Sequence, residues 1–344
     1  MPMEGIREPQ TSLWISEQLP DLLPPLSYEL IAGGRSNLTF AVDDANGQRI
    51  VLRRPPTSHV LPTAHDMHRE FRIISALHPL GFPVATPLAI CMDPEVNDYP
   101  FYLMSYVHGS ILRDPELAQA HFPDQPMRRQ IAENLVSTLV KLHGYDVEKI
   151  GLSDLARHDG YIERQLRRWY TQFQASSSEI DHRVPLVDEM FAKLAERIPA
   201  QKRTSVVHAD YRLDNAMVAD DGSIAAVLDW ELCTLGDPLA DIGTLLVYWT
   251  EPEDTNVPLS AVTALPGFPR RAEVAEWYAS GAGVDLGLIN YYIAFAYWRL
   301  ACILEGVYSR YVQGARGGDR SSITDYARQV ELLAESSREA LSRY

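Results

Sequence analysis

The sequence has little of three features that would each indicate a particular class of protein. Its 344 residues include three scattered cysteines, Cys91, Cys233 and Cys302, which form neither a disulfide framework nor a zinc pattern. Its net charge is −15, which argues against a nucleic-acid partner. The longest apolar stretch, residues 286–312, contains charged residues, as a buried helix does and a membrane span does not. The first ten residues have no apolar core, so we expect no signal peptide and a cytoplasmic location.

The sequence pattern changes near residue 107. Before that point, short runs of branched and aromatic residues predict strands at 27–31, 38–42, 49–53, 84–92 and 101–107. Helices are expected at 64–78 and, as a short amphipathic segment, at 11–19. After it, helical spacing predicts helices at 126–143, 160–176, 184–198, 238–249, 270–281, 286–312 and 321–342. Short strands are expected at 206–208, 216–219 and 225–228. We predict an α+β protein with a small β-rich domain, residues 1–107, and a larger, mostly helical domain, residues 108–344.

One stretch carries a pattern of polar residues at defined spacing. In His208-Ala-Asp210-Tyr-Arg-Leu-Asp214-Asn215, an asparagine follows an aspartate by five residues. Transfer of a phosphoryl group to a hydroxyl needs a carboxylate that accepts the proton and orients the oxygen, and Asp210 suits that role. An isolated aspartate here would more simply be a turn or capping residue. The spacing to Asn215 favours the catalytic interpretation, with His208 bracing the loop.

Asp229 follows an apolar run fourteen residues after Asn215. Mg²⁺ prefers a few protein oxygens together with phosphate oxygens and water, so Asn215 and Asp229 are the expected metal ligands. Either residue could instead be a turn residue, and Asp214 is an alternative ligand at a less suitable spacing. Arg212 lies two residues after the proposed base, and it either faces the phosphates or is a solvated arginine.

Nucleotide contacts are expected from the first domain. Gly33-Gly34-Arg35-Ser36-Asn37 lies between two predicted strands, and Gly34, Ser36 and Asn37 could cover phosphates. The segment matches neither G-x-G-x-x-G nor the Walker pattern, so a simple hairpin turn is the alternative.

A second nucleotide contact is expected where a strand cation meets a helix carboxylate. Arg53 ends the third predicted strand and Glu70 lies on the next helix, and such a pair can position nucleotide phosphates. A surface ion pair is the alternative. Ser105 and Val107 follow the last strand of the domain, where their backbone groups could bind an adenine.

Together these segments resemble the aminoglycoside phosphotransferase family of kinase-like small-molecule phosphotransferases. The resemblance runs from about Leu30 to Ala301 and is most specific at His208-Ala-Asp210…Asn215 and Leu-Asp229-Trp-Glu…Gly-Asp-Pro-Leu-Ala-Asp241. It is similar to the branch represented by kinase-like domains fused to acyl-CoA dehydrogenases. The resemblance implies a two-lobed protein-kinase-like fold, with Asp210 as catalytic residue and Asn215 and Asp229 as Mg²⁺ ligands. The chain departs from the family at Arg53, where the family has lysine.

We therefore expect an ATP-dependent O-phosphotransferase that uses Mg²⁺ and transfers the γ-phosphate to a small-molecule hydroxyl. GTP is the alternative donor, and an aminoglycoside-like compound, a hydroxyacyl-CoA or another alcohol is the acceptor. A catalytically silent nucleotide-binding protein is the alternative from another class, supported by Arg53. A kinase that acts on proteins is a poorer fit, because the H-R-D, D-F-G and A-P-E motifs are absent. The oligomeric state is not indicated.

Overall fold

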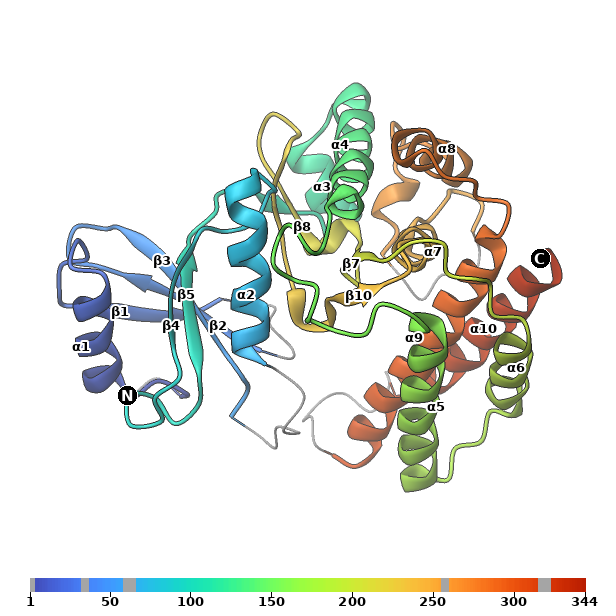
Figure 1. Cartoon of the computed structure of the whole chain (residues 1–344), viewed down its shortest axis with the longest axis horizontal. Helices are drawn as coiled ribbons and strands as arrows, with labels where there is room; N and C mark the ends of the chain where they lie inside the picture. The colour runs from blue at the N-terminus through green and yellow to red at the C-terminus, as the bar shows by residue number, and fades with distance from the viewer. Residues whose placement is uncertain (1–3, 32–36, 58–65, 255–259, 315–322) are drawn as a thin grey trace. The chain divides into compact units, whose positions relative to one another are not determined.

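The computed structural model describes residues 4–31, 37–57, 66–254, 260–314 and 323–344, and the chain forms two compact units (Figure 1). The first unit comprises Met1–Ser110 together with Ile224–Leu232. The second comprises Ile111–Ser223 together with Cys233–Tyr344. The functional division at residue 107 remains a prediction. Asp229 thus belongs to the same compact unit as Arg53 and Glu70, far from them in sequence.

The first unit is built on an antiparallel sheet whose described strands have the order β1-β2-β3-β5-β4. The strands are β1 Ser27–Leu30, β2 Leu38–Asp43, β3 Arg49–Arg54, β4 Pro87–Cys91 and β5 Phe101–Ser105. Asp44 begins the β2–β3 turn, where one of its carboxylate oxygens accepts hydrogen bonds from the backbone N–H groups of Asn46 and Gln48. Such local bonds stabilise a tight turn, so β2 and β3 pair residue by residue.

Alternation along the strands gives the sheet two different faces. On one face, Phe40, Leu52 and Leu103 pack in a buried cluster that includes Ile15 of helix α1, Glu8–Gln18. Helix α2, Met67–Leu77, contacts β4 and β5 and carries Glu70. The 3₁₀ turn η1, His78–Leu80, follows it, and strand β9, Ile224–Val227, and turn η3, Trp230–Leu232, complete the unit.

The second unit is mostly helical. Its helices are α3 Pro115–His121, α4 Gln125–Gly144, α5 Tyr161–Ile180, α6 Pro185–Glu196, α7 Leu239–Tyr248, α8 Arg271–Ala282, α9 Ile289–Val312 and α10 Ile323–Ser342. Helix α9 packs against α10, α7, α5 and α6, and α4 packs against α8 (Figure 1). The tryptophans Trp249 and Trp298 are buried. Within the described residues, no helix is both long and apolar enough to span a membrane.

Short strands and turns position the predicted catalytic segment. Strand β7, Ser205–Val207, pairs antiparallel with β10, Thr234–Gly236. The 3₁₀ turn η2, Leu213–Asn215, precedes strand β8, Ala216–Val218, and strand β6, Ser110–Ile111, lies at the sequence boundary between the units. The His208–Asn215 segment therefore begins at a buried strand and ends at a second one, which restrains both of its ends.

Two differences from the sequence expectations concern short elements. Helix α3 was not predicted, although Asp114 caps it by accepting a hydrogen bond from the Leu117 N–H and a proline begins it. Both are ordinary signals for a helix start, but seven residues give too short an apolar pattern to detect. The stretch 251–269, between the helices predicted at 238–249 and 270–281, contains the turn η4, Val262–Ala264, and its residues 255–259 lie outside the described part.

Gly243 permits the close approach of α7 to α9. A methyl group at this position would lie 2.8 Å from the backbone carbon and oxygen of Tyr292, which cannot move as a side chain can. We expect Gly243→Ala to destabilise the protein by about 1–3 kcal/mol, the range for overpacking a close-packed core. Gly144→Ala is the control, because Gly144 is helical and an added methyl group there would meet no atom from the rest of the described chain within 4 Å. This change should leave stability unchanged or slightly higher. Urea unfolding of both variants checks this, and equal midpoints would contradict it.

Candidate active site

Arg53 is the centre of an ion-pair network in the first unit. Its Nε donates to Glu70 at 2.9 Å and its Nη2 to Asp229 at 2.6 Å. Strand register explains the geometry, because Arg53 lies opposite Tyr102 of β5, and the Tyr102 hydroxyl donates to the same Glu70 oxygen at 3.1 Å. The strand cation and the helix carboxylate are thus brought together, as the sequence predicts. A role for the pair in binding nucleotide phosphates stays a prediction.

Glu70 depends on this network because it is 1% exposed. Burial raises the pKa of its carboxyl above the usual value, since the charged form loses its hydration, and Arg53 opposes that shift. The second oxygen of Glu70 accepts a hydrogen bond from Asn37 Nδ2 at 3.0 Å, and the same amide group donates to Glu231 at 3.2 Å. Asn37 therefore joins the end of the predicted glycine-containing loop to two carboxylates.

Asp229 follows strand β9 in a left-handed backbone conformation, with φ of 63°. This conformation is uncommon for a residue with a side chain, and aspartate tolerates it better than most. The next residue, Trp230, is buried and donates from its indole nitrogen to the Val227 carbonyl. The turn at Asp229 is therefore held by strand β9 on one side and by the buried Trp230 indole on the other. The Asp229 side chain is partly exposed, with 31% of its surface accessible.

In the second unit, Asp210 and Asn215 contact each other directly. Asn215 Nδ2 donates to Asp210 Oδ2 at 2.8 Å and to its backbone oxygen at 2.9 Å. His208 is fully buried, and its Nδ1 accepts the backbone N–H of Asp210 at 3.3 Å, which agrees with the bracing role expected for it. Asp241 accepts the N–H groups of His208 and Ala209, so it joins α7 to this loop. Asp210 remains partly accessible, with 22% of its side chain exposed.

Arg212 contacts the two aspartates of the same loop. Its Nε lies 3.3 Å from Asp210 Oδ2 and its Nη1 lies 2.7 Å from Asp214 Oδ2. Its guanidinium also lies over the Tyr248 ring, 4.6 Å from the centroid. Burial raises the pKa of Asp214, whereas Arg212 opposes the shift. Arg212 is thus fixed beside the proposed base by contacts with Asp210, Asp214 and Tyr248. A solvated arginine would lack these contacts.

The two predicted metal ligands can be tested for chemical fit one at a time. The Asn215 amide uses its nitrogen for Asp210, and its oxygen accepts no hydrogen bond from any described residue. Asp229 accepts from Arg53 with Oδ1, and among the described residues its Oδ2 accepts none. Hard oxygens of this kind suit Mg²⁺. The described part of the chain contains no group of three or more His, Cys, Asp or Glu side chains that could hold a metal by itself.

Other predicted residues are less informative in the structure. Gly34 and Ser36 lie outside the described residues. Ser105 ends β5 and its hydroxyl accepts the Thr86 N–H at 2.9 Å, and Val107 follows in the segment after the strand. Neither observation tests an adenine contact.

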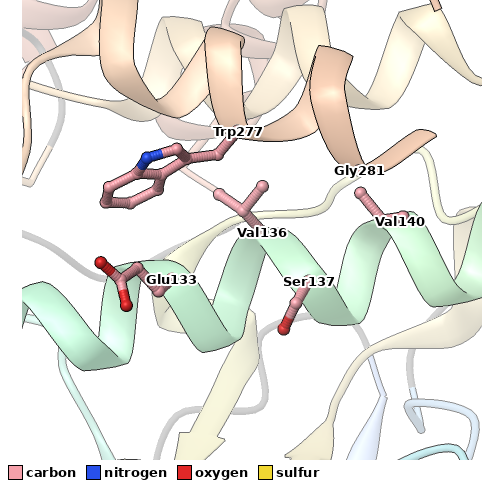
Figure 2. Close-up of a pocket in the computed structure, with 6 residues that line it drawn as sticks. All are labelled: Glu133, Val136, Ser137, Val140, Trp277 and Gly281. Atoms are coloured by element: carbon pink, nitrogen blue, oxygen red, sulfur yellow. The ribbon is translucent and has the colours of Figure 1, made fainter. Parts of the chain in front are cut away.

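A cavity of about 270 Å³ lies between α4 and α8, and Figure 2 shows the Trp277 indole facing Val136 across it. Its remaining lining residues are Glu133, Ser137, Val140 and Gly281. None of these is a predicted site residue, so this cavity is separate from the candidate site.

Sequence reasoning missed three contacts of the candidate site. It did not anticipate the bond between Arg53 and Asp229, the contribution of Tyr102, or the ring of Tyr248 against Arg212. The alternation of β5 could have placed Tyr102 opposite Arg53 once the strand pairing was known. The other two contacts carry no local sequence signal.

Removal of the Arg53 charge should have a pH-dependent effect on stability. In Arg53→Met, Glu70 loses its cation while buried, which costs about 3–5 kcal/mol near neutral pH. Without that cation, the pKa of Glu70 should rise further above its unfolded value of 4.5. The folded variant then binds a proton that the unfolded chain has released, so its stability falls as pH rises through this range. The loss should be larger at pH 8 than at pH 5.

Urea unfolding of the native chain and the variant at both pH values tests this expectation. Arg49→Met is the matched control, because Arg49 lies on the same strand and pairs with Asp43 at the exposed surface. We expect that variant to stay close to native at both pH values. A similar loss for the two variants, or a loss independent of pH, would contradict the assignment of Arg53 as the cation that compensates Glu70.

Comparison with known proteins shows which family the chain belongs to. The model of the phosphotransferase enzyme family matches residues 27–276. Acyl-CoA dehydrogenase family member 10 of Mus musculus is 36% identical over 316 residues, which cover 89% of this chain and 28% of the mouse protein. The chain thus spans less than a third of that relative's length.

Solved structures agree with the predicted fold. A putative aminoglycoside phosphotransferase from Ralstonia eutropha JMP134 is 30% identical, with a TM-score of 0.79 and coverage of 97% of this chain and 98% of that one. Spectinomycin phosphotransferase, solved with ADP and spectinomycin, is 12% identical, with a TM-score of 0.61 and coverage of 99% and 100%. At that identity, the likeness concerns the fold alone. The predicted α+β, protein-kinase-like fold is confirmed, and the chain belongs to the phosphotransferase enzyme family.

Proposed function

We propose that this protein is an ATP-dependent O-phosphotransferase that transfers the γ-phosphate to a hydroxyl group of a small molecule. The observation that carries the proposal is the pair formed by Asp210 and Asn215 in one braced loop. Asp210 keeps an accessible carboxylate, and the Asn215 amide oxygen accepts no hydrogen bond from the described residues. ATP is proposed as the donor, with GTP as the alternative. Support for a nucleotide donor comes from the spectinomycin phosphotransferase of the same fold, which was solved with ADP.

The reaction assigns a separate task to each residue. Asp210 accepts the proton of the acceptor hydroxyl and orients its oxygen toward the γ-phosphorus. Asn215 and Asp229 are the proposed Mg²⁺ ligands, and the ion would neutralise charge on the phosphate oxygens. Arg212 restrains the base loop through its contact with Asp210, and we propose that it also contacts a phosphate. The nucleotide-contacting residues are proposed to be Gly34, Ser36, Asn37, Arg53, Glu70, Ser105 and Val107.

The acceptor is proposed to contact the second unit around residues 250–285. A hydroxyacyl-CoA is a reasonable acceptor to test first, because the mouse relative has an acyl-CoA dehydrogenase name. Aminoglycoside-like compounds and other alcohols belong in the same screen. The three cysteines, all among the described residues, are buried and form no disulfide. Because they are scattered and odd in number, we propose a reducing, cytoplasmic location.

A specific observation supports the alternative of a catalytically silent protein. The Arg53 guanidinium is engaged by both Glu70 and Asp229, so a phosphate would meet a cation that already has two partners. If these bonds persist, the chain would keep the fold without binding the nucleotide productively. The two experiments below distinguish this alternative from the proposed enzyme.

Binding of Mg·ATP should raise the melting temperature of the native chain and not that of Asp229→Ala. A ligand present at a hundred times its dissociation constant stabilises the folded state by about 2.7 kcal/mol, a readily measured shift. Asp220→Ala is the control, because this aspartate is exposed in the turn between β8 and β9 and should keep the shift. Absence of any shift with millimolar ATP or GTP in the native chain would favour the silent alternative.

Asp210→Asn should abolish transfer and keep nucleotide binding. Asparagine is similar in size and still accepts a hydrogen bond from Asn215, but it cannot take up the hydroxyl proton. We expect ADP release with an active alcohol to fall about 10²–10⁴-fold, the usual contribution of a general base. The Mg·ATP melting shift should remain, and Asp220→Asn should behave as the native chain. Native-like turnover in Asp210→Asn would exclude Asp210 as the base.

A further inference from the structure

The backbone that leads into Asp210 is held by one buried carboxylate. Asp241 has no exposed surface, and its oxygens accept the His208 N–H at 2.7 Å and the Ala209 N–H at 2.8 Å. Ala209 has a φ of 68°, a left-handed conformation that residues with side chains rarely adopt. Such conformations persist only where surrounding bonds stabilise them. The position of Asp210 therefore depends on Asp241 keeping its place.

Asp241 is in turn held by a histidine from another helix. His143, near the end of α4 and 1% exposed, places Nε2 3.1 Å from Asp241 Oδ2. Because an ionised carboxylate only accepts hydrogen bonds, Nε2 must carry a proton. The backbone oxygen of His143 also accepts the Ser205 hydroxyl at 2.9 Å, at the start of β7, which leads into the same loop. His143 thus contacts the loop support through both its ring and its backbone.

The second ring nitrogen of His143 faces Tyr278 of α8. The distance from Nδ1 to the Tyr278 hydroxyl is 2.7 Å, and the phenol is 1% exposed. With a neutral imidazole, the phenol donates to Nδ1, and this bond selects the tautomer in which Nε2 donates to Asp241. A hydrogen bond to the second nitrogen of an imidazole fixes the orientation of the ring. Tyr278, His143 and Asp241 therefore form a continuous chain of hydrogen bonds from α8 through α4 and α7 to the loop.

We propose that Tyr278 and His143 are positioning residues for Asp210 and act on it through Asp241. The inference rests on the proposed role of Asp210 as the base. Neither residue approaches the reacting atoms in this scheme. Both stabilise the left-handed turn at Ala209, from which the base is presented. Helix α8 lies within the region proposed to contact the acceptor, so the same bonds connect that region to the catalytic loop.

The matched test compares Tyr278→Phe with Tyr291→Phe. Each change removes one buried phenol hydroxyl and keeps the ring, but the Tyr291 hydroxyl donates to the Leu194 carbonyl, away from the loop. Hydrogen–deuterium exchange of the full chain, followed by mass spectrometry, reports on the amides of His208 and Ala209. Tyr278→Phe should exchange faster in this segment, whereas Tyr291→Phe should match the native chain there. Unchanged protection in Tyr278→Phe would overturn the proposal.

A second pair of variants separates the two nitrogens of His143. His143→Gln keeps a donor near the Nε2 position, and His143→Asn keeps a polar group near Nδ1 and loses the bond to Asp241. We expect His143→Asn to deprotect the loop strongly and His143→Gln to preserve most of its protection. Equal effects of the two variants would argue that the histidine only fills space. Melting curves confirm that each variant is folded before exchange is compared.

Turnover of Mg·ATP, with water as the acceptor, gives the functional readout. A displaced base should lower kcat by as much as about a hundredfold and leave the KM for Mg·ATP within about twofold of native. A fall in kcat in Tyr291→Phe equal to that in Tyr278→Phe would contradict a positioning role. If the native chain neither binds nor hydrolyses ATP, the proposed function fails. The exchange experiments still decide whether Tyr278 and His143 support the loop.

Discussion

A single guanidinium in the first unit compensates a group of carboxylates, and the rest of that unit's candidate site depends on it. Arg53 bonds to Glu70 and Asp229, and Glu231 is linked to Glu70 through Asn37. Removing a carboxylate from water is unfavourable unless a cation and further hydrogen bonds replace the hydration. Glu70 has that replacement from Arg53, Tyr102 and Asn37. Arg53 itself is fixed by strand pairing, so the sheet register decides whether the carboxylates can be buried at all.

Local sequence patterns predicted the parts of this arrangement that come from neighbouring residues. Arg53 was expected at the end of the strand 49–53 and Glu70 on the helix 64–78, and the structure has them on β3 and α2. The interval between Asp210 and Asn215 placed both residues in one segment, and in the structure they share a hydrogen bond of 2.8 Å. Such contacts are predictable because periodicity and short intervals restrict the geometry of a few residues. The roles of these residues in catalysis still rest on the proposed function.

Contacts between distant segments were not predictable in the same way. The segment Ile224–Leu232 joins the N-terminal compact unit, and this brings Asp229 to Arg53 although they are 176 positions apart in sequence. The bonds of His143 to Tyr278 and Asp241 likewise join α4, α8 and α7. A histidine at the end of a helix, or a tyrosine within one, has the same local sequence in many settings. The partner of such a residue is decided by tertiary packing, so it cannot be predicted from a single sequence without the fold.

The family resemblance implies a lysine where this chain has Arg53, and an arginine can share its charge with partners in a different way. A lysine ammonium is one compact charge, whereas the planar guanidinium has five N–H donors in fixed directions. Arg53 directs Nε to Glu70 and Nη2 to Asp229, and its Nη1 lies 3.5 Å from the Thr39 hydroxyl, which is a long bond. Bidentate binding of a phosphate uses two adjacent N–H groups. If the proposed nucleotide binds at Arg53, its phosphate would either share the guanidinium with Asp229 or displace that carboxylate. Under the proposed function, nucleotide affinity therefore depends on how Arg53 divides its N–H donors between Asp229 and a phosphate.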